Sequence, residues 1–333
     1  MIIECSNCKK RYKIQEDRLQ EGKIFNFSCK NCSAKIHLDL RKTPVKTESL
    51  PVSETGQKDL KDEILEKIDH LPPLPHVVMK LRQLIADPDS DARKIAEVIE
   101  TDQAIVTKVL KIANSSYYGL SSKISSIQHA LVVLGNKTLG QMVITAGTEG
   151  TLARKLSGYG YDTKTLWKHS LAVAFGSKII ADMRVPALGN EAYTAGLIHD
   201  VGKIILDGYI LEQKDEIESY MEREEKTFLD AENHFFVFNH ADIAYEVCKN
   251  WNFPESLNMA IKNHHRPSSD DSNDLQYILH MADNLARLSG TGYDDDGFLY
   301  EVAEGTMDHL SLKQEDVSKI VLKITESVIK LSS

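Results

Sequence analysis

The sequence has no run of about 18 uncharged apolar residues, so no membrane-spanning helix is expected among its 333 residues. Its first residues, MIIECSNCKKRYK, lack the basic start and long apolar stretch of a secretory signal peptide. A cytoplasmic location and no membrane partner are therefore expected. Hydrophobic residues make up 42% and charged residues 27% of the chain, which is the composition of an ordinary globular protein.

Positive charge is scarce beyond the first 42 residues. Residues 1–42 hold ten Lys and Arg against five Asp and Glu, whereas the remaining residues hold thirty against forty-four. Neutralisation of phosphates dominates non-specific affinity for nucleic acid, so the large acidic part makes a poor nucleic-acid binder. The small basic part could still contact an acidic partner.

Cysteine is also rare, and four of the five cysteines lie in the basic part: Cys5, Cys8, Cys29 and Cys32. They form two Cys-x2-Cys pairs separated by twenty residues. Each pair makes a tight turn that aims two thiolates at one point, and two such turns complete a closed tetrahedral zinc site. Two disulfides are the alternative, but disulfides are rare in the cytosol. Four thiolates leave no open position, which argues against a catalytic zinc.

Short stretches around these cysteines alternate polar and apolar residues as strands do, at residues 12–14, 24–27 and 36–38. We therefore predict a small β zinc ribbon over residues 1–40. Residues 41–60 are rich in Pro, Ser, Thr and Lys and have almost no apolar periodicity, which predicts a flexible linker.

Helical periodicity dominates from residue 61 onward. Val77, Leu81 and Leu84 belong to one apolar stripe, and Asp91 and Asp102 are among the residues suited to cap the helices that follow. No segment alternates convincingly as a strand. We therefore predict a mainly all-α chain, with a helical domain over residues 61–331.

Several short motifs in this domain occur in an order that resembles the HDOD family. They are Leu71-Pro-Pro-Leu-Pro75, Glu100-Thr-Asp102, Leu110-Lys-Ile-Ala-Asn-Ser115, Ile127-Gln-His-Ala130 and Leu134-Gly135. The resemblance covers roughly residues 61–285. It implies an HD-domain-like helical bundle in a bacterial signal-transduction output or regulatory protein, which binds a signalling protein partner or a ligand.

Seven of the twelve histidines fall between residues 169 and 280, accompanied by aspartates. The order of a subset resembles the HD phosphohydrolase superfamily: His169, His199-Asp200 with Gly202 and Lys203, His240, His264-His265 and Asp283. This resemblance implies a metal centre within residues 165–285. Taken singly, each histidine is better explained as a surface or satisfied core residue.

The chemistry of these residue types suggests a division of roles. If residues 199 and 200 are helical, their side chains project about 100° apart, so His199 can hold one ion while Asp200 bridges to a second. His169 and Asp283 would complete the first shell, and His240, His264 and His265 would surround the second ion. Mixed imidazole and carboxylate ligands suit a divalent iron or manganese pair.

Asp200 and Lys203 are the candidate catalytic residues. Two ions could activate water and neutralise a phosphate oxygen. Lys203 is expected on the same helical face as Asp200, from which it could pair with a substrate phosphate.

Two differences from related phosphodiesterases narrow the reactions expected of this protein. Cyclic-di-GMP phosphodiesterases of the HD-GYP group have a Gly-Tyr-Pro segment after the His-His pair, whereas residues 266–274 here lack it. Thr165 stands where some of those enzymes have a carboxylate for a third metal. Neither cyclic-di-GMP hydrolysis nor a trinuclear centre is therefore expected. Two functions stay open. The protein is either a signalling output protein with a structural or regulatory metal, or a metal-dependent phosphohydrolase that acts on a nucleotide or phosphodiester.

Overall fold

The chain forms two compact units, Met1–Asp59 and Leu60–Ser333, in the computed structural model. In the first unit the structure describes residues 2–4, 11–13, 24–28, 32 and 35–39. In the second it describes residues 63–64, 66–68, 74–86, 91–236, 238–268, 273–291 and 300–332. The two units are treated separately below.

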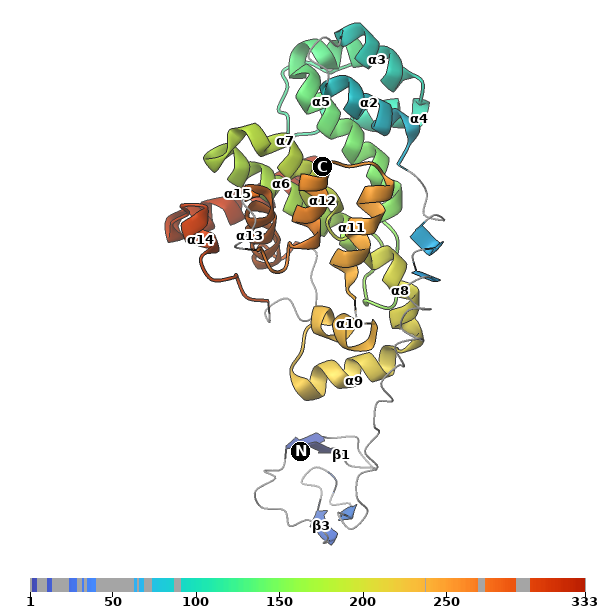
Figure 1. Ribbon diagram of the computed structural model, residues 1–333, viewed down its shortest axis with the longest axis vertical. Helices are drawn as coiled ribbons and strands as arrows, with labels where there is room; N and C mark the ends of the chain where they lie inside the picture. Colours follow the sequence, from blue (N-terminus) through green and yellow to red (C-terminus); the bar gives the residue numbers. More distant parts are fainter. Residues whose placement is uncertain are drawn as a thin grey trace. The chain divides into compact units, whose positions relative to one another are not determined.

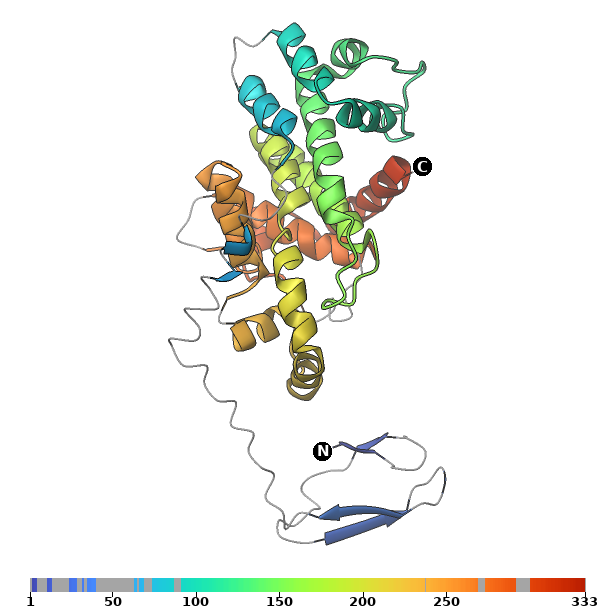
Figure 2. The ribbon, with the colours of Figure 1, turned by 90° about the vertical axis from the view of Figure 1, so that its right-hand side faces the viewer.

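Two antiparallel strand pairs are described in the first unit (Figure 2). Strand β1 (Ile2–Glu4) pairs with β2 (Arg11–Lys13), and β3 (Ile24–Ser28) pairs with β4 (Lys35–Asp39). Strands β2, β3 and β4 overlap the three stretches in which the sequence alternates, whereas β1 was not expected.

The zinc site predicted for this unit falls mostly outside the described residues. Cys5, Cys8 and Cys29 are not among them, and only Cys32 is. The predicted linker, residues 41–60, also lies outside. The four-cysteine site and the linker therefore stay predictions.

The second unit begins with a group of four helices at one end (Figure 1). They are α2 (His76–Ala86), α3 (Ala92–Glu100), α4 (Gln103–Ala113) and α5 (Ile127–Leu152). Asp91 and Asp102 cap α3 and α4, because their carboxylates accept hydrogen bonds from backbone N–H groups in the first turn. Gly135 kinks α5 at a φ of 79°, a conformation that favours glycine.

The remaining helices form a second group, with a short 3-10 turn at Pro186–Leu188. They are α6 (Thr165–Arg184), α7 (Gly189–Ile198), α8 (Lys203–Glu212), α9 (Lys214–Glu224), α10 (Phe228–Phe236), α11 (His240–Asn250), α12 (Glu255–Lys262), α13 (Asp274–Leu288), α14 (Thr306–His309) and α15 (Gln314–Ser332).

Helix α6 lies at the centre of this group and packs against α7, α13 and α15. Its apolar residues are buried on more than one side, as expected for a helix enclosed by others. The predicted HD-like all-α bundle is confirmed for this unit. None of the helices that the structure describes is long and apolar enough to span a membrane, and the cytoplasmic location stays a prediction.

The segment that carries His199 and Asp200 differs in detail from the expected helix. Helix α7 ends at Ile198, and residues 199–202 form a tight turn before α8 begins at Lys203. The backbone N–H of Lys203 donates to the carbonyl of Asp200 at 3.0 Å, which closes the turn.

Gly202 lets this turn approach the start of α11. A Cβ atom added at Gly202 would lie 2.0 Å from the carbonyl oxygen of His240 and 2.8 Å from the backbone nitrogen of Ala244. Any larger residue would push α11 away. Glycine at this position therefore holds His240 close to the His199-Asp200 turn.

Gly202→Ala should destabilise the protein by about 2–3 kcal/mol, because the added methyl group meets backbone rather than a movable side chain. Gly208→Ala, in the helix α8 that follows the turn, is the matched control, since nothing lies within 4 Å of its Cβ position. That change should be neutral or stabilise by about 0.5–1 kcal/mol. Urea unfolding followed by circular dichroism measures both. Equal stability of the two variants would contradict the close packing.

Candidate metal centre

Five separate elements of the second unit bring the predicted metal ligands together. Helix α6 carries His169, the α7–α8 turn carries His199 and Asp200, and α11 begins with His240. The segment after α12 carries His264 and His265, and α13 carries Asp283. All are buried except His265, which is partly exposed. The seven side chains form three overlapping groups in which the potential ligand atoms lie within 4.8 Å of one another.

Asp200 lies between two sets of imidazoles. Its Oδ2 faces Nε2 of His199 at 3.4 Å and Nε2 of His169 at 3.7 Å. Its Oδ1 faces Nε2 of His240 at 3.3 Å and Nε2 of His264 at 3.7 Å. The carboxylate therefore has one oxygen on each side, which is the arrangement that a bridging ligand needs.

Asp283 completes the first side. Its Oδ1 lies 3.1 Å from Nε2 of His169 and 3.7 Å from Nε2 of His199. Together with Asp200, these residues supply two imidazoles and two carboxylates.

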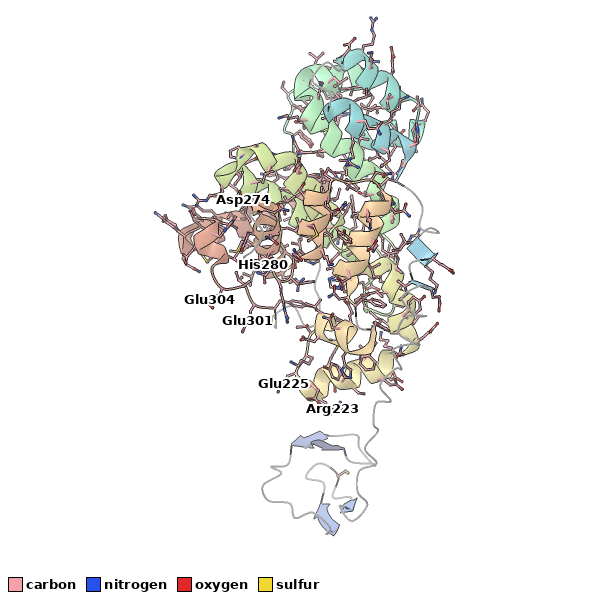
Figure 3. The ribbon with its side chains drawn as sticks, in the orientation of Figure 1. Arg223, Glu225, Asp274, His280, Glu301 and Glu304 are labelled. Atoms are coloured by element: carbon pink, nitrogen blue, oxygen red, sulfur yellow. The ribbon has the colours of Figure 1, made fainter. Side chains whose placement is uncertain are left out.

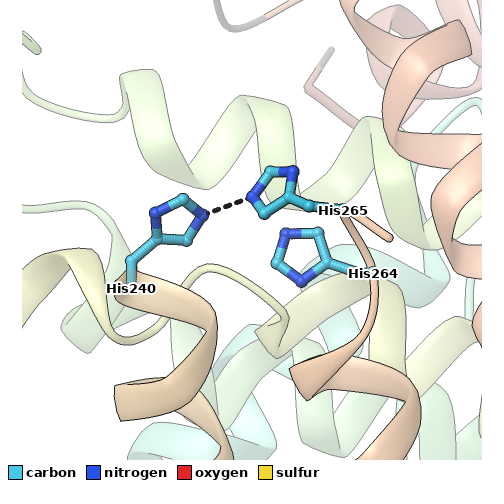
Figure 4. A group of neighbouring side chains, drawn as sticks. All are labelled: His240, His264 and His265. Atoms are coloured by element: carbon cyan, nitrogen blue, oxygen red, sulfur yellow. Dashed lines mark hydrogen bonds between the residues drawn. The ribbon is translucent and has the colours of Figure 1, made fainter. Parts of the chain in front are cut away.

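The second side consists of three histidines (Figure 4). Nε2 of His265 lies 2.7 Å from Nε2 of His240, as the dashed line in Figure 4 shows. The ring of His264 lies against that of His265, with centroids 3.9 Å apart. The Nε2 atoms of His240 and His264 both face Oδ1 of Asp200.

Backbone carbonyls orient two of the rings. Nδ1 of His199 lies 2.8 Å from the carbonyl oxygen of Gly196, and Nδ1 of His264 lies 2.6 Å from that of Ile261. When each Nδ1–H donates to its carbonyl, the lone pair of Nε2 is left facing the centre. Histidines that bind metals in proteins are commonly held in this way.

Glu232 orients the ring of His240 in the same way, and no motif in the sequence marked it. Its Oε2 accepts a hydrogen bond from the backbone N–H of His240 at 2.8 Å and lies 2.7 Å from Nδ1 of that ring. Its Oε1 accepts from the hydroxyl of Tyr159 at 2.6 Å. Its position eight residues before His240, in a segment with Leu229, Phe235 and Phe236, was the available signal in the sequence.

Unsatisfied polar atoms show that this donor set fits a cation. Oδ1 of Asp200 and Nε2 of His199 and His264 are buried without a hydrogen-bond partner in the described part of the chain, whereas Oδ2 of Asp200 has an ion pair with Lys203. Buried polar atoms are nearly always paired, so such a group requires an explanation, and an ion is one. Neutral imidazole and ionised carboxylate are the forms that bind metals.

Four of the ligand-type residues have pKa shifts that favour those forms, whereas the pKa of His240 is shifted the other way, to about 9, by Glu232 and Asp200. Burial lowers the pKa of His264 and His265 well below the ordinary histidine value, so both rings are neutral at pH 7. Burial by itself would raise the pKa of Asp200, but the neighbouring His199 and Lys203 hold it well below its usual range. Arg287 and His169 do the same for Asp283 against the effect of burial.

Two cationic side chains already contact the carboxylates. Nζ of Lys203 lies 2.9 Å from Oδ2 of Asp200 and donates to the hydroxyl of Tyr161 at 3.3 Å. Arg287, four residues after Asp283 on α13, lies 2.7 Å from Oδ2 of that carboxylate. Lys203 is buried, and its ion pair balances the charge of Asp200; its pairing with a substrate phosphate stays a prediction.

Three other polar residues of the second helical group have structural contacts. His280 is labelled in Figure 3. Its Nδ1 lies 2.7 Å from the carbonyl oxygen of His264, and its Nε2 accepts a hydrogen bond from the backbone N–H of Ala303, which ties two segments together. Asp242 forms a capping box with Asn239 at the start of α11. His234 stacks on Tyr220.

Comparison with solved structures places this fold among known proteins. An HDOD domain protein of unknown function from Geobacter sulfurreducens superposes with a TM-score of 0.63 at 24% identity, over 84% of this chain and 94% of that one. A protein from Marinobacter aquaeolei VT8, provisionally named a signal transduction protein, gives a TM-score of 0.67 at 19% identity, over 84% and 66%. A protein from Shewanella amazonensis SB2B, provisionally named a metal-dependent phosphohydrolase, gives 0.55 at 18% identity, over 84% and 100%. At these identities the likeness establishes the fold.

The second unit is thus an all-α bundle of the HD-like class with a buried cluster of histidines and aspartates. A family model of the HDOD domain matches residues 71–267, more than half of the sequence, and the chain belongs to the HDOD family. An uncharacterized protein of Treponema pallidum (strain Nichols) is 25% identical over 214 residues. That alignment covers 64% of this chain and 41% of the relative, so the chain spans less than half the length of the relative.

The Glu232–His240 contact predicts a pH-dependent stability in protein stripped of metal. Burial lowers the pKa of His240, but Glu232 and Asp200 outweigh it and raise the pKa from 6.5 to about 9. The resulting stabilisation is complete below pH 6.5 and is lost as the pH rises through 9. Glu232→Gln should therefore lower the unfolding midpoint most below pH 6.5, and the deficit should shrink above pH 9 because the charge contribution has gone.

Thermal unfolding in the presence of a chelator measures this difference. Glu246→Gln, on the same helix as His240 but with a partly exposed side chain, is the matched control and should show no such pH dependence. A deficit of Glu232→Gln that is constant across this pH range would contradict the charge interaction.

Proposed function

We propose that this protein is a signal-transduction output or regulatory protein whose HDOD domain holds a divalent metal centre and binds a partner or ligand. The observation that carries the metal assignment is Asp200, a buried carboxylate with one oxygen toward each of two histidine groups. The family membership and the likeness in fold to a protein provisionally named for signal transduction support the output role.

The ligand chemistry suggests which ions would be bound. His169, His199 and Asp283 would hold one ion and His240, His264 and His265 the other, with Asp200 between them. Imidazole with carboxylate suits iron or manganese better than it suits a thiophilic ion. When bound, such ions act as Lewis acids and make water a better nucleophile.

The surroundings of the centre favour a regulatory metal over turnover. Lys203 and Arg287 both form ion pairs with ligand carboxylates, so their charges compensate Asp200 and Asp283. The ring of Tyr300 stacks on His265, the most exposed of the predicted ligands, and so covers it. The centre of the same ring lies 3.8 Å from the guanidinium of Arg287. A substrate would have to displace Tyr300 to reach the histidines on that side.

Metal-dependent phosphohydrolysis is the alternative. It is supported by the complete set of seven ligand-type residues around a central carboxylate, which is sufficient for two ions. A structure of the same fold is provisionally named a metal-dependent phosphohydrolase. The substrate would be a nucleotide or phosphodiester.

Metal analysis of the full chain separates these possibilities. We expect protein purified without oxygen to carry iron or manganese, and Asp200→Asn to lose most of it because the bridging carboxylate loses its charge. Asp182→Asn, an exposed aspartate on α6 paired with Lys178, is the control and should keep the metal. The same three proteins are then assayed with p-nitrophenyl phosphate, bis-p-nitrophenyl phosphate and nucleotides.

Hydrolysis that requires Asp200 would replace the regulatory assignment with the phosphohydrolase. If neither wild type nor Asp200→Asn contains iron or manganese, a metal centre is excluded. A metal that is lost in Asp200→Asn without any hydrolysis by wild type is the result that the regulatory assignment requires.

We further propose that residues 1–40 bind one zinc ion as a ribbon on a flexible linker, as a docking or structural module. Four cysteines in two Cys-x2-Cys pairs support this. Cys29→Ser should lower the zinc content by about one ion per chain while leaving the Asp200-dependent metal unchanged. Atomic emission analysis of both metals checks this. Retention of the zinc in Cys29→Ser would contradict a four-thiolate site.

A further inference from the structure

A second site lies in a cavity of about 410 Å³ within the second unit. Helices α2 and α5 of the first helical group line one side, and α7 and the start of α12 line the other. Its apolar wall includes Met79, Ile85, Ile144, Phe253 and Leu257. This volume is in the range of pockets that hold small organic molecules in proteins.

Arg82 gives the cavity a positive charge. Its guanidinium lies 3.6 Å from the centre of the Phe253 ring, and none of the described carboxylates forms an ion pair with it. Burial lowers the pKa of Arg82, and the group that opposes this shift is the thiol of Cys248 rather than a carboxylate. An arginine nevertheless stays charged at neutral pH, so a half-buried cation is available to a ligand.

The polar groups around Arg82 are suited to a single anionic group. Lys137 lines the same cavity and has no ion pair within the part of the chain that the structure describes. Glu191 also lines it, but this side chain is exposed and contacts neither cation in an ion pair. The amide of Gln141 donates to that of Asn190 at 2.9 Å, which leaves the Gln141 carbonyl and the Asn190 N–H groups for further bonds.

From these observations we propose that the cavity binds a small amphipathic organic anion. Its planar apolar body lies among Phe253, Ile144 and Leu257, and its carboxylate, sulfonate or phosphate group pairs with Arg82. A guanidinium stacked on an aromatic ring keeps its in-plane N–H groups free to bind such an oxyanion.

This site is distinct from the metal centre. Asn190 lies near the start of α7, which ends just before His199, and Leu257 lies in α12, which ends just before His264. At 1.5 Å per helical residue, these lining residues lie about 14 Å and about 10 Å from the histidines. Thr194 also lines the cavity and lies five residues before His199, about 8 Å along α7. None of the proposed metal ligands lines the cavity, so the two sites do not overlap.

Binding of 8-anilinonaphthalene-1-sulfonate to the full chain tests the proposal, with neutral N-phenyl-1-naphthylamine as a probe of similar shape. We expect saturable binding of one sulfonate probe per chain. Arg82→Met keeps a long apolar side chain without the charge, and it should weaken the sulfonate about tenfold while changing the neutral probe little. Lys80→Met, an exposed residue of α2 that does not line the cavity, is the matched control and should leave both affinities unchanged.

Two more variants keep the result decisive if Arg82→Met unfolds. Lys137→Met removes an exposed charge of the lining and should weaken the sulfonate about threefold. Gln83→Trp, at an exposed lining position, should obstruct both probes. Asp200→Asn should bind the sulfonate normally, which separates this site from the proposed metal function.

The proposal is overturned if the sulfonate does not saturate at one per chain. It is also overturned if folded Arg82→Met and Lys137→Met both bind the sulfonate as wild type does, because the probe would then be an adventitious binder of exposed apolar surface.

Discussion

The central constraint on the helical domain is the burial of the Asp200 carboxylate. A charge removed from water is tolerated only when other groups compensate it, and here five different segments supply those groups. Imidazoles approach from α6, α11 and the ends of α7 and α12, and Lys203 approaches from the start of α8. The packing of the second helical group is therefore also the assembly of its polar centre.

Close backbone contacts make that assembly possible. At Gly202 the turn between α7 and α8 touches the first turn of α11, and at Gly196 helix α7 touches the backbone of α6 at Val173 and Ala174. Side chains at these glycines would separate the helices that carry the ligands. The Gly of the His-Asp-x-Gly-Lys motif is thus explained by packing, and the His and Asp by the charge that this packing encloses.

The two helical groups meet at a cavity whose character differs from that of the centre. The centre concentrates ionisable groups of both signs, whereas the cavity is mainly apolar with Arg82 set against Phe253. Helices α7 and α12 contribute to both places. A ligand in the cavity would contact the same two helices that precede His199 and His264.

Much of this could be predicted from the sequence, because periodicity and motif order are local properties. The all-α fold and the capping aspartates were predicted from residues alone, and the set of histidines and aspartates from the resemblance of their order to the HD phosphohydrolase superfamily. The turn at residues 199–202 was not, since its backbone angles are close to helical ones and short-range patterns cannot distinguish the two. Glu232 and Arg287 were missed because no motif marks them, although Arg287 follows Asp283 at helical spacing.

The sequence by itself determined the kinds of residue available, namely a cysteine set suited to zinc and a histidine–aspartate set suited to harder divalent ions. Only the tertiary structure decided how the second set is used. It placed Asp200 between two imidazole groups, and it turned Lys203 toward that carboxylate. The reason is physical, because a buried charge takes its partners from whatever packing brings near, and packing is a property of the whole fold.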